Sequence, residues 1–266
     1  MINLNKPPLF HQMRALGLNV VHPPRASLRP LDILMLNGRT LCRWGRLDAV
    51  FESKKEVPDV SCDQVISNLF GQTKETFVAN LGFSLLNSII AKMGISIGLE
   101  SAYSDAAELQ FSYENITSEF CDAASIDHYI NTSKLNPDMK STQKYLLSNK
   151  LYVVTEVYKS NRIAVGAKDA SGLSLDIKLT NTALEEASAE VESSSSLSSL
   201  FQGSIPLTIG IRAFQIGYKT DGNQCWCELV SANTKLQSKS VNEDSVSNSV
   251  LVYKPLEIDT IFEYVE

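Results

Sequence analysis

The sequence predicts an α+β fold, in which a twisted, mainly antiparallel sheet is flanked by a few helices. Several short segments alternate apolar and polar side chains, as strands with one face in water do. Tight turns join many of these segments, and no regular strand–helix repeat appears, so a parallel sheet is not expected. The 266 residues fit one large domain or two small ones and can bury a hydrophobic core.

The first part of the chain predicts a short helix followed by a hairpin. Phe10–Gly17 carries apolar residues at helical spacing and ends in a glycine. Val20–Pro24 is expected to be extended, because prolines interrupt it. Leu31–Leu36 and Thr40–Trp44 are expected to be two strands joined by a turn at Asn37-Gly38.

The middle of the chain predicts the main helix and two strands. Gly45–Glu52 is expected to form a helical turn or a short connection. Thr76–Met93 carries apolar residues four apart, with others alongside, which predicts a helix with a broad apolar face. The period then changes to two, which predicts strands over Ile95–Leu99 and Ala107–Tyr113. Ser125–Leu147 has a mixed pattern with helical parts.

The later part of the chain predicts a meander of three strands, over Leu151–Val157, Ile163–Ala167 and Leu173–Leu179. Tight connections are expected at 159–162 and 169–172, where polar and turn-forming residues gather.

Beyond the meander, the chain predicts an irregular stretch and then a hairpin. Asn181–Gly203 is rich in Ser and Glu and is predicted to be a linker or an exposed helix, too polar for the core. Ile205–Lys219 and Gln224–Val230 are predicted to form a hairpin across Asp221-Gly222.

The distribution of charge argues for an anionic partner. The net charge of −6 argues against a nucleic-acid binder, which is normally basic. The first 55 residues nevertheless carry nine basic and three acidic side chains, so this segment is positive and the remainder is strongly negative. A membrane surface would suit such asymmetry, and a solvated basic face is the alternative. The candidate lipid contacts are Arg14, Arg25 and Arg29.

The five cysteines indicate free thiols in a reducing compartment, because their number is odd, their spacing is irregular and no signal peptide precedes them. No second Cys/His pair has zinc-ligand spacing, so neither a metal nor another cofactor is predicted. The longest uncharged run falls short of the roughly 20 residues that span a bilayer as a helix. The cysteines are Cys42, Cys62, Cys121, Cys225 and Cys227.

The C-terminal end of the chain combines a polar tether with an apolar tail. Ser231–Ser249 is rich in Ser, Asn and Lys, whereas Val250–Glu266 carries many apolar residues that cannot all stay in water. The tail is therefore expected to dock on the sheet, and a cut between Ser231 and Val250 would release it. Thr260 and Glu263 could cap a short terminal helix. The residues expected to dock are Leu251, Leu256, Ile258, Ile261 and Phe262.

This tail divides the chain into a body (1–232), a cleavable polar linker (233–249) and an inhibitory tail (250–266). One alternative is a soluble β-rich binding module whose tail packs permanently.

A hydrolase is the second alternative, because Gly94–Gly98 matches the G-x-S-x-G pattern with Ser96 as the nucleophile. That motif needs a strand before it and a helix after it, and here the predicted order is reversed. His128 is the only histidine downstream of it. No enzyme is therefore predicted.

Four blocks of sequence, in this order and spacing, resemble the bacterial gasdermins, which are short relatives of the animal gasdermin pore-formers. Together they span most of Gly17–Val230. The blocks are Gly17–Arg25 with Leu31–Leu34; Gly82–Ile90 through Ile97–Tyr103 and Leu109–Ile116; Lys150–Ile163; and Ser204–Gly210 with Tyr218.

The resemblance implies a gasdermin-like N-terminal domain that is kept inactive, as a cytoplasmic monomer, by a C-terminal peptide. It also implies that a protease, often caspase-like in this family, removes the peptide. The freed protein would then bind anionic lipids, insert into the inner membrane and oligomerise into large β-lined pores, and the resulting cell death would limit phage spread. Bacterial members often carry an acylated cysteine near the N-terminus. Met1–Phe10 has none, so lipidation is not predicted there.

Overall fold

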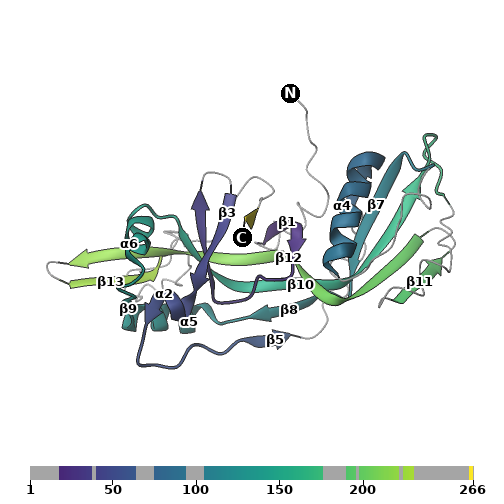
Figure 1. The fold of residues 1–266 in the computed structure, drawn as a ribbon. Helices are drawn as coiled ribbons and strands as arrows, with labels where there is room; N and C mark the ends of the chain where they lie inside the picture. The colour runs from purple at the N-terminus through teal and green to yellow at the C-terminus, as the bar shows by residue number, and fades with distance from the viewer. Residues whose placement is uncertain are drawn as a thin grey trace, which may run out of the picture.

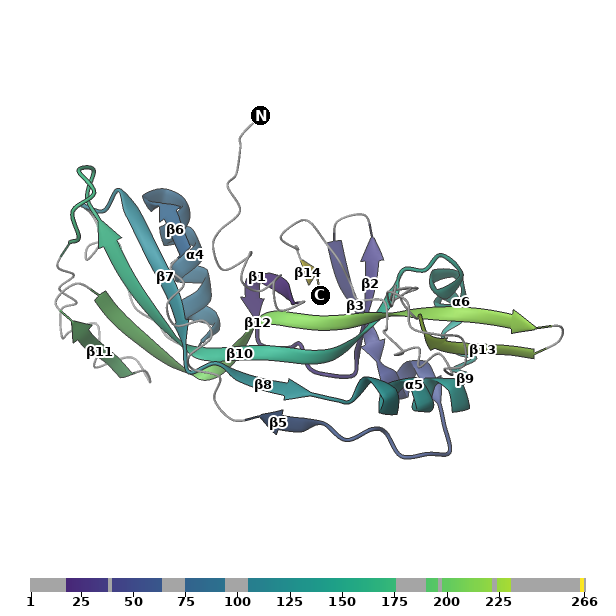
Figure 2. The ribbon, with the colours of Figure 1, turned by 180° about the vertical axis from the view of Figure 1, so that it is seen from behind.

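Two long strands organise the fold. The computed structural model describes residues 18–37, 40–63, 75–93, 105–175, 190–195, 198–221, 224–230 and 264–265. Strands β10 (Leu151–Lys168) and β12 (Ser198–Asp221) pair antiparallel along most of their length. They run from one end of the molecule to the other (Figures 1 and 2), and six of the other twelve described strands pair directly with one of them.

The central part of the sheet has the order β1-β12-β10-β2-β3-β14. Strand β1 covers Asn19–Arg25 and pairs with β12. Strands β2 (Asp32–Asn37) and β3 (Thr40–Arg46) form the hairpin that the sequence predicts. The last strand, β14 (Tyr264–Val265), runs parallel to β3.

Helix α4 (Ala79–Lys92) lies at one end of the molecule, next to β7 (Glu108–Glu114) and β6 (Glu75–Val78). The predicted helix over Thr76–Met93 is therefore wrong in its first turn. Residues 75–78 pair with β7 instead, and their β-branched and aromatic side chains favour a strand.

Smaller elements gather at the opposite end, where the predicted turn after Trp44 and the predicted helical parts of Ser125–Leu147 are found. The side chain of Asp122 caps helix α5 (Ala123–Thr132) by accepting a hydrogen bond from Ser125 N at 2.9 Å. The elements are α2 (Leu47–Val50), β4 (Phe51–Glu52), β5 (Ser61–Asp63), β8 (Thr117–Phe120), α5 (Ala123–Thr132), β9 (Lys134–Leu135), α6 (Lys140–Leu147) and β13 (Gln224–Leu229).

Both faces of the central sheet are buried, because side chains of β10 alternate between two apolar clusters. Leu151 and Val153 pack with residues of α2, α5 and α6 on one face. Tyr152 and Val154 pack with residues of β1 and β3 on the other. The run at the start of β10 is consequently apolar without a wet face, as expected for a strand covered on both sides.

The predicted turn at 159–162 is wrong, because β10 continues through it as one strand of 18 residues. The pairing with β12 jumps from Ser160↔Leu207 to Arg162↔Gln202, so a bulge stands where the sequence suggests a turn. Ser160 Oγ satisfies the local backbone, since it accepts from Arg162 N at 3.1 Å and lies 2.6 Å from the Glu114 carbonyl oxygen. These contacts explain why a polar stretch can remain inside a sheet.

The interpretation of 181–203 as linker or exposed helix is also wrong for its described part. Strand β11 (Glu190–Ser195) pairs with β12, which already begins at Ser198. Leu200 and Phe201 are buried. A serine-rich composition concealed them, because only these two apolar side chains mark the strand there.

The hairpin of β12 and β13 agrees with the prediction. Asp169 forms the predicted turn after β10 by accepting hydrogen bonds from Ser171 N and Leu173 N. Of the predicted strand at 173–179, the described residues show one bridge, between Ser174 and Lys168. The predicted helix over Phe10–Gly17 and strand over Ile95–Leu99 lie outside the described residues. Within the part of the chain that the structure describes, no helix is both long enough and apolar enough to cross a membrane.

Candidate functional site

The C-terminal strand lies on the outer edge of β3. Its two residues, Tyr264 and Val265, stand opposite Leu41 and Cys42. Strand β14 also approaches β1, and Figures 1 and 2 both show it between β1 and β3. The end of the chain thus covers β3 on the side away from β2 and lies where two distant parts of the sheet come close together.

The expectation of a short terminal helix is wrong for Tyr264–Val265, which are extended. The reason is the available partner: an open strand edge satisfies the backbone groups of a passing segment through pairing. Thr260 and Glu263, which were expected to cap that helix, lie outside the described residues.

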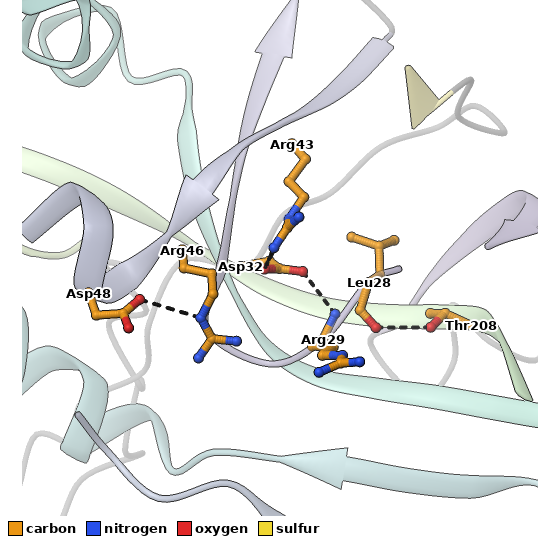
Figure 3. Close-up of polar contacts among 7 residues, drawn as sticks. All are labelled: Leu28, Arg29, Asp32, Arg43, Arg46, Asp48 and Thr208. Atoms are coloured by element: carbon orange, nitrogen blue, oxygen red, sulfur yellow. Dashed lines mark hydrogen bonds and ion pairs between the residues drawn. The ribbon is translucent and has the colours of Figure 1, made fainter. Parts of the chain in front are cut away.

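The loop between β1 and β2, residues 26–31, presents one basic side chain, that of Arg29 (Figure 3). Arg29 is exposed at the loop, whereas Arg25 is half-buried and makes contacts within the protein. The Leu28 carbonyl accepts a hydrogen bond from Thr208 Oγ1 at 3.3 Å. Leu31 has a positive φ of 70°, and its N–H donates to the Val154 carbonyl at 2.8 Å. Both ends of the loop are therefore held on the long strands.

Asp32 joins this loop to β3 through a fully buried carboxylate. Its Oδ1 accepts from Arg43 Nε at 3.2 Å and Nη2 at 3.0 Å, and its Oδ2 accepts from Arg29 N at 2.9 Å. Burial raises the pKa of Asp32, and the hydrogen bonds from Arg29 and Arg43 oppose this rise without cancelling it.

The raised pKa of Asp32 predicts a pH-dependent contribution of this residue to the free energy of unfolding. Between the ordinary pKa of 3.8 and the raised pKa, the folded protein binds more protons than the unfolded chain. The contribution of Asp32 to the free energy of unfolding therefore falls as pH rises. Asp32→Asn removes the titration. Urea midpoints measured from pH 3.5 to about pH 7 should show wild-type stability falling relative to the variant as pH rises. A constant difference between the two proteins across this range would contradict the prediction.

A groove of about 590 Å³ lies beside the loop. Arg29 and Arg46 line it, and Arg46 pairs with Asp48 at 3.4 Å. Val60 and Ile205, two large apolar side chains with about 40% exposure, line it as well (39% and 41%). Positive charge and exposed apolar surface therefore occur together here, which is a combination that suits the boundary between lipid headgroups and acyl chains.

Of the residues that the sequence singles out, the structure places Arg25 at the end of β1 and Arg29 in the loop that joins β1 to β2. Arg14, the linker 233–249 and the five tail residues lie outside the described residues. The sequence pattern did not predict a role for Asp32 or Arg43. One signal was available for Asp32, which is an acidic residue inside the apolar run 31–36, where a charge must be paired.

The hydrolase alternative gains no support from the described residues. Ser96 lies outside them, and the described side chains include no cluster of three metal-binding groups. Ring nitrogen Nε2 of His128 lies 2.5 Å from Lys55 Nζ on an exposed surface. Burial and the nearby carboxylates of Asp122 and Asp59 raise the pKa of the Cys121 thiol to about 11, which disfavours the reactive thiolate.

Comparisons with known proteins agree with this fold. The model of the Bacterial Gasdermin Family matches residues 21–223. Gasdermin bGSDM of Lysobacter enzymogenes is 32% identical over 223 residues, which cover 79% of this chain and 80% of the relative. The gasdermin of a Vitiosangium species is 27% identical over 217 residues, or 80% and 82% of the two chains.

Among solved structures, a bacterial gasdermin from Bradyrhizobium tropiciagri has a TM-score of 0.57 to this chain at 18% identity. The match covers 82% of this chain and 89% of that one, and it shows a shared fold. The family model spans most of the chain, and the Lysobacter relative is nearly one-third identical to it. The chain belongs to the bacterial gasdermin family.

Proposed function

We propose that this protein is a pore-forming gasdermin that its own C-terminal segment holds inactive. Membership of the family supports a pore-forming effector rather than an enzyme. In this proposal, residues 1–232 form the pore, 233–249 are the cleavable linker and 250–266 inhibit. A partner protease cuts the linker, and the freed body assembles into oligomers in the inner membrane. The resulting cell death serves defence against phage.

The observation that carries this proposal is the pairing of β14 with β3. An edge strand with unpaired backbone groups invites pairing with another segment or another chain, and β14 occupies that edge. The described pairing involves only two residues, so it is weak by itself. We expect the tail to stay bound because the linker keeps it close to β3. A tethered tail has a high local concentration near its site, and a cut peptide loses that advantage.

The basic loop and groove support a membrane as the target. Arg25 and Arg29, with Arg14 as a further candidate, would contact anionic headgroups, and Val60 and Ile205 would meet the apolar boundary. Each basic residue near an anionic surface contributes about 1 kcal/mol to attraction, so a few of them suffice for salt-dependent binding.

Dye release from liposomes tests the proposal. A full-length chain that carries the recognition sequence of a site-specific protease within 233–249 is mixed with vesicles containing anionic lipid. We expect little release before cleavage and rapid release afterwards. The control is the wild-type chain, without the inserted recognition sequence, treated with the same protease. Intact vesicles after complete cleavage would refute the pore and favour a binding module with a permanently packed tail.

A further inference from the structure

We propose that Asp32 is a positioning residue that couples the β3 edge, where β14 pairs, to the basic loop that presents Arg29. The inference rests on the proposed function in one respect, namely that β14 leaves β3 on activation. It assigns a role to a carboxylate that contacts neither the tail strand nor the membrane. The coupling would let removal of the tail change how the loop is held.

Arg43 lies on β3 directly next to the residues that pair with β14. It follows Leu41 and Cys42, the two residues that stand opposite β14. Pairing of β3 with β2 shifts register by one residue just beyond it, since Ile33 faces Gly45 and Leu34 faces Arg43. The segment of β3 next to β14 is thus separated from the rest of the strand by a bulge.

Beyond the bulge, β3 is anchored on the helical end of the molecule. Trp44 Nε1 donates to Thr142 Oγ1 at 3.0 Å, and its ring stands edge-on to Tyr145 at a centroid distance of 4.8 Å. Any adjustment after loss of β14 is therefore expected in residues 40–43 rather than in 44–46. Arg43 lies in the part that is free to adjust.

The buried charge of Asp32 depends on its ion pair with Arg43. Its carboxylate is 0% exposed, while the Arg43 side chain is 39% exposed. A buried carboxylate that loses its cation is left without compensation, which is far less favourable than keeping the pair. Movement of Arg43 must therefore move Asp32 or admit water to it (Figure 3).

Asp32 also holds the β1–β2 loop at Arg29. The second oxygen of Asp32 accepts from Arg29 N, and Asp32 N donates to the Arg29 carbonyl at 3.2 Å. These two hydrogen bonds define the backbone at Arg29. Because one carboxylate holds Arg43 with one oxygen and Arg29 with the other, a disturbance at β3 reaches the loop through a single group.

Amide hydrogen exchange of the peptide covering 28–32 tests the coupling directly, with no need for a membrane. The full chain with the cleavable linker is compared before and after cleavage and removal of the tail peptide. We expect exchange over 28–32 to accelerate by about tenfold or more on cleavage, as for a segment that opens locally. Unchanged exchange after cleavage would overturn the proposal, even if the cleaved protein forms pores. Faster exchange without dye release would uphold the coupling and refute the pore instead.

Three substitutions, alone or combined, separate coupling from simple loss of structure. Arg43→Gln should exchange fast over 28–32 before cleavage and respond little to it, by about twofold or less. Lys219→Gln is the matched control, because Lys219 also lies on a strand and pairs with a partly exposed carboxylate, that of Glu228 at 3.4 Å, and its exchange over 28–32 should match wild type. If Lys219→Gln reproduces the effect of Arg43→Gln, the proposal fails.

Asp32→Asn keeps an acceptor for Arg29 N and removes the charge. Combined with Arg43→Gln, it should return exchange over 28–32 to within about threefold of wild type, because no buried charge is left unpaired. A double variant that exchanges as fast as Arg43→Gln alone would overturn the charge-based coupling. Asp32→Asn alone should reduce the response to cleavage, which keeps the test decisive if Arg43→Gln does not fold.

Discussion

Replacing both residues of β14 with proline should make the uncut protein permeabilise liposomes. Proline has no N–H and cannot donate to a ladder, so Tyr264→Pro with Val265→Pro prevents the pairing with Leu41 and Cys42. Losing one or two backbone hydrogen bonds costs about 1 kcal/mol each. The population with a free β3 edge should therefore rise by about 5- to 30-fold, and dye release from the uncut chain should accelerate accordingly.

The matched control is Tyr264→Ala with Val265→Ala, which retains both N–H groups and changes only the side chains. This variant should release dye much more slowly than the double proline variant, and melting temperatures of both should be recorded to exclude unfolding. Equal release from the two variants would assign the restraint to side chains instead of backbone pairing. No release from the proline variant would show that residues before β14 suffice to hold the tail.

The variant Gly203→Ala should destabilise the contact between α4 and the long strands. A Cβ at Gly203 would lie 2.4 Å from the Met93 carbonyl oxygen and 2.5 Å from Met93 Cβ, far inside contact distance. Met93 is buried at the end of α4, so the last turn of the helix would have to move away from β12. Overpacking of this kind costs about 1–3 kcal/mol, which lowers the melting temperature by roughly 3–10 °C.

We also expect α4 to leave this position when the proposed pore inserts into the membrane, so Gly203→Ala should release dye faster than wild type once the linker is cut. Gly45→Ala is the control, because its added Cβ would meet only the ends of two side chains that can adjust, Val50 Cγ2 at 3.3 Å and Met139 Cε at 3.9 Å. That substitution should change the melting temperature by less than about 3 °C. A wild-type melting temperature for Gly203→Ala would mean that α4 does not depend on this close approach.

The alternating pattern was sufficient to predict an antiparallel α+β fold, since a strand with one covered face requires that pattern. The β2–β3 and β12–β13 hairpins followed from turn residues and were confirmed. Predictions failed where local chemistry had two solutions. Residues 159–162 are suited both to a turn and to a bulge, and the neighbours on β7 and β12 select the bulge.

The candidate site was predictable only in part. Excess positive charge in the first segment made Arg25 and Arg29 candidates for lipid contact, because charge is visible in composition. The pairing of Asp32 with Arg43 was not visible, since the two are 11 positions apart and meet only when β2 and β3 align across a one-residue shift. Similarly, no local signal shows that 264–265 prefer a strand to a helix; the β3 edge supplies the partner.

The sequence alone determined that this chain has a mainly antiparallel sheet, a basic first segment and an apolar tail on a polar tether, because each of these is a property of neighbouring residues. Only the tertiary structure decided which strand the last described residues pair with and which strands continue through bulges. It also decided which buried carboxylate connects the β1–β2 loop to β3. Those features depend on backbone and side-chain groups that are far apart in the chain. Their partners come from separate segments of the chain, which meet only in the folded sheet built on β10 and β12.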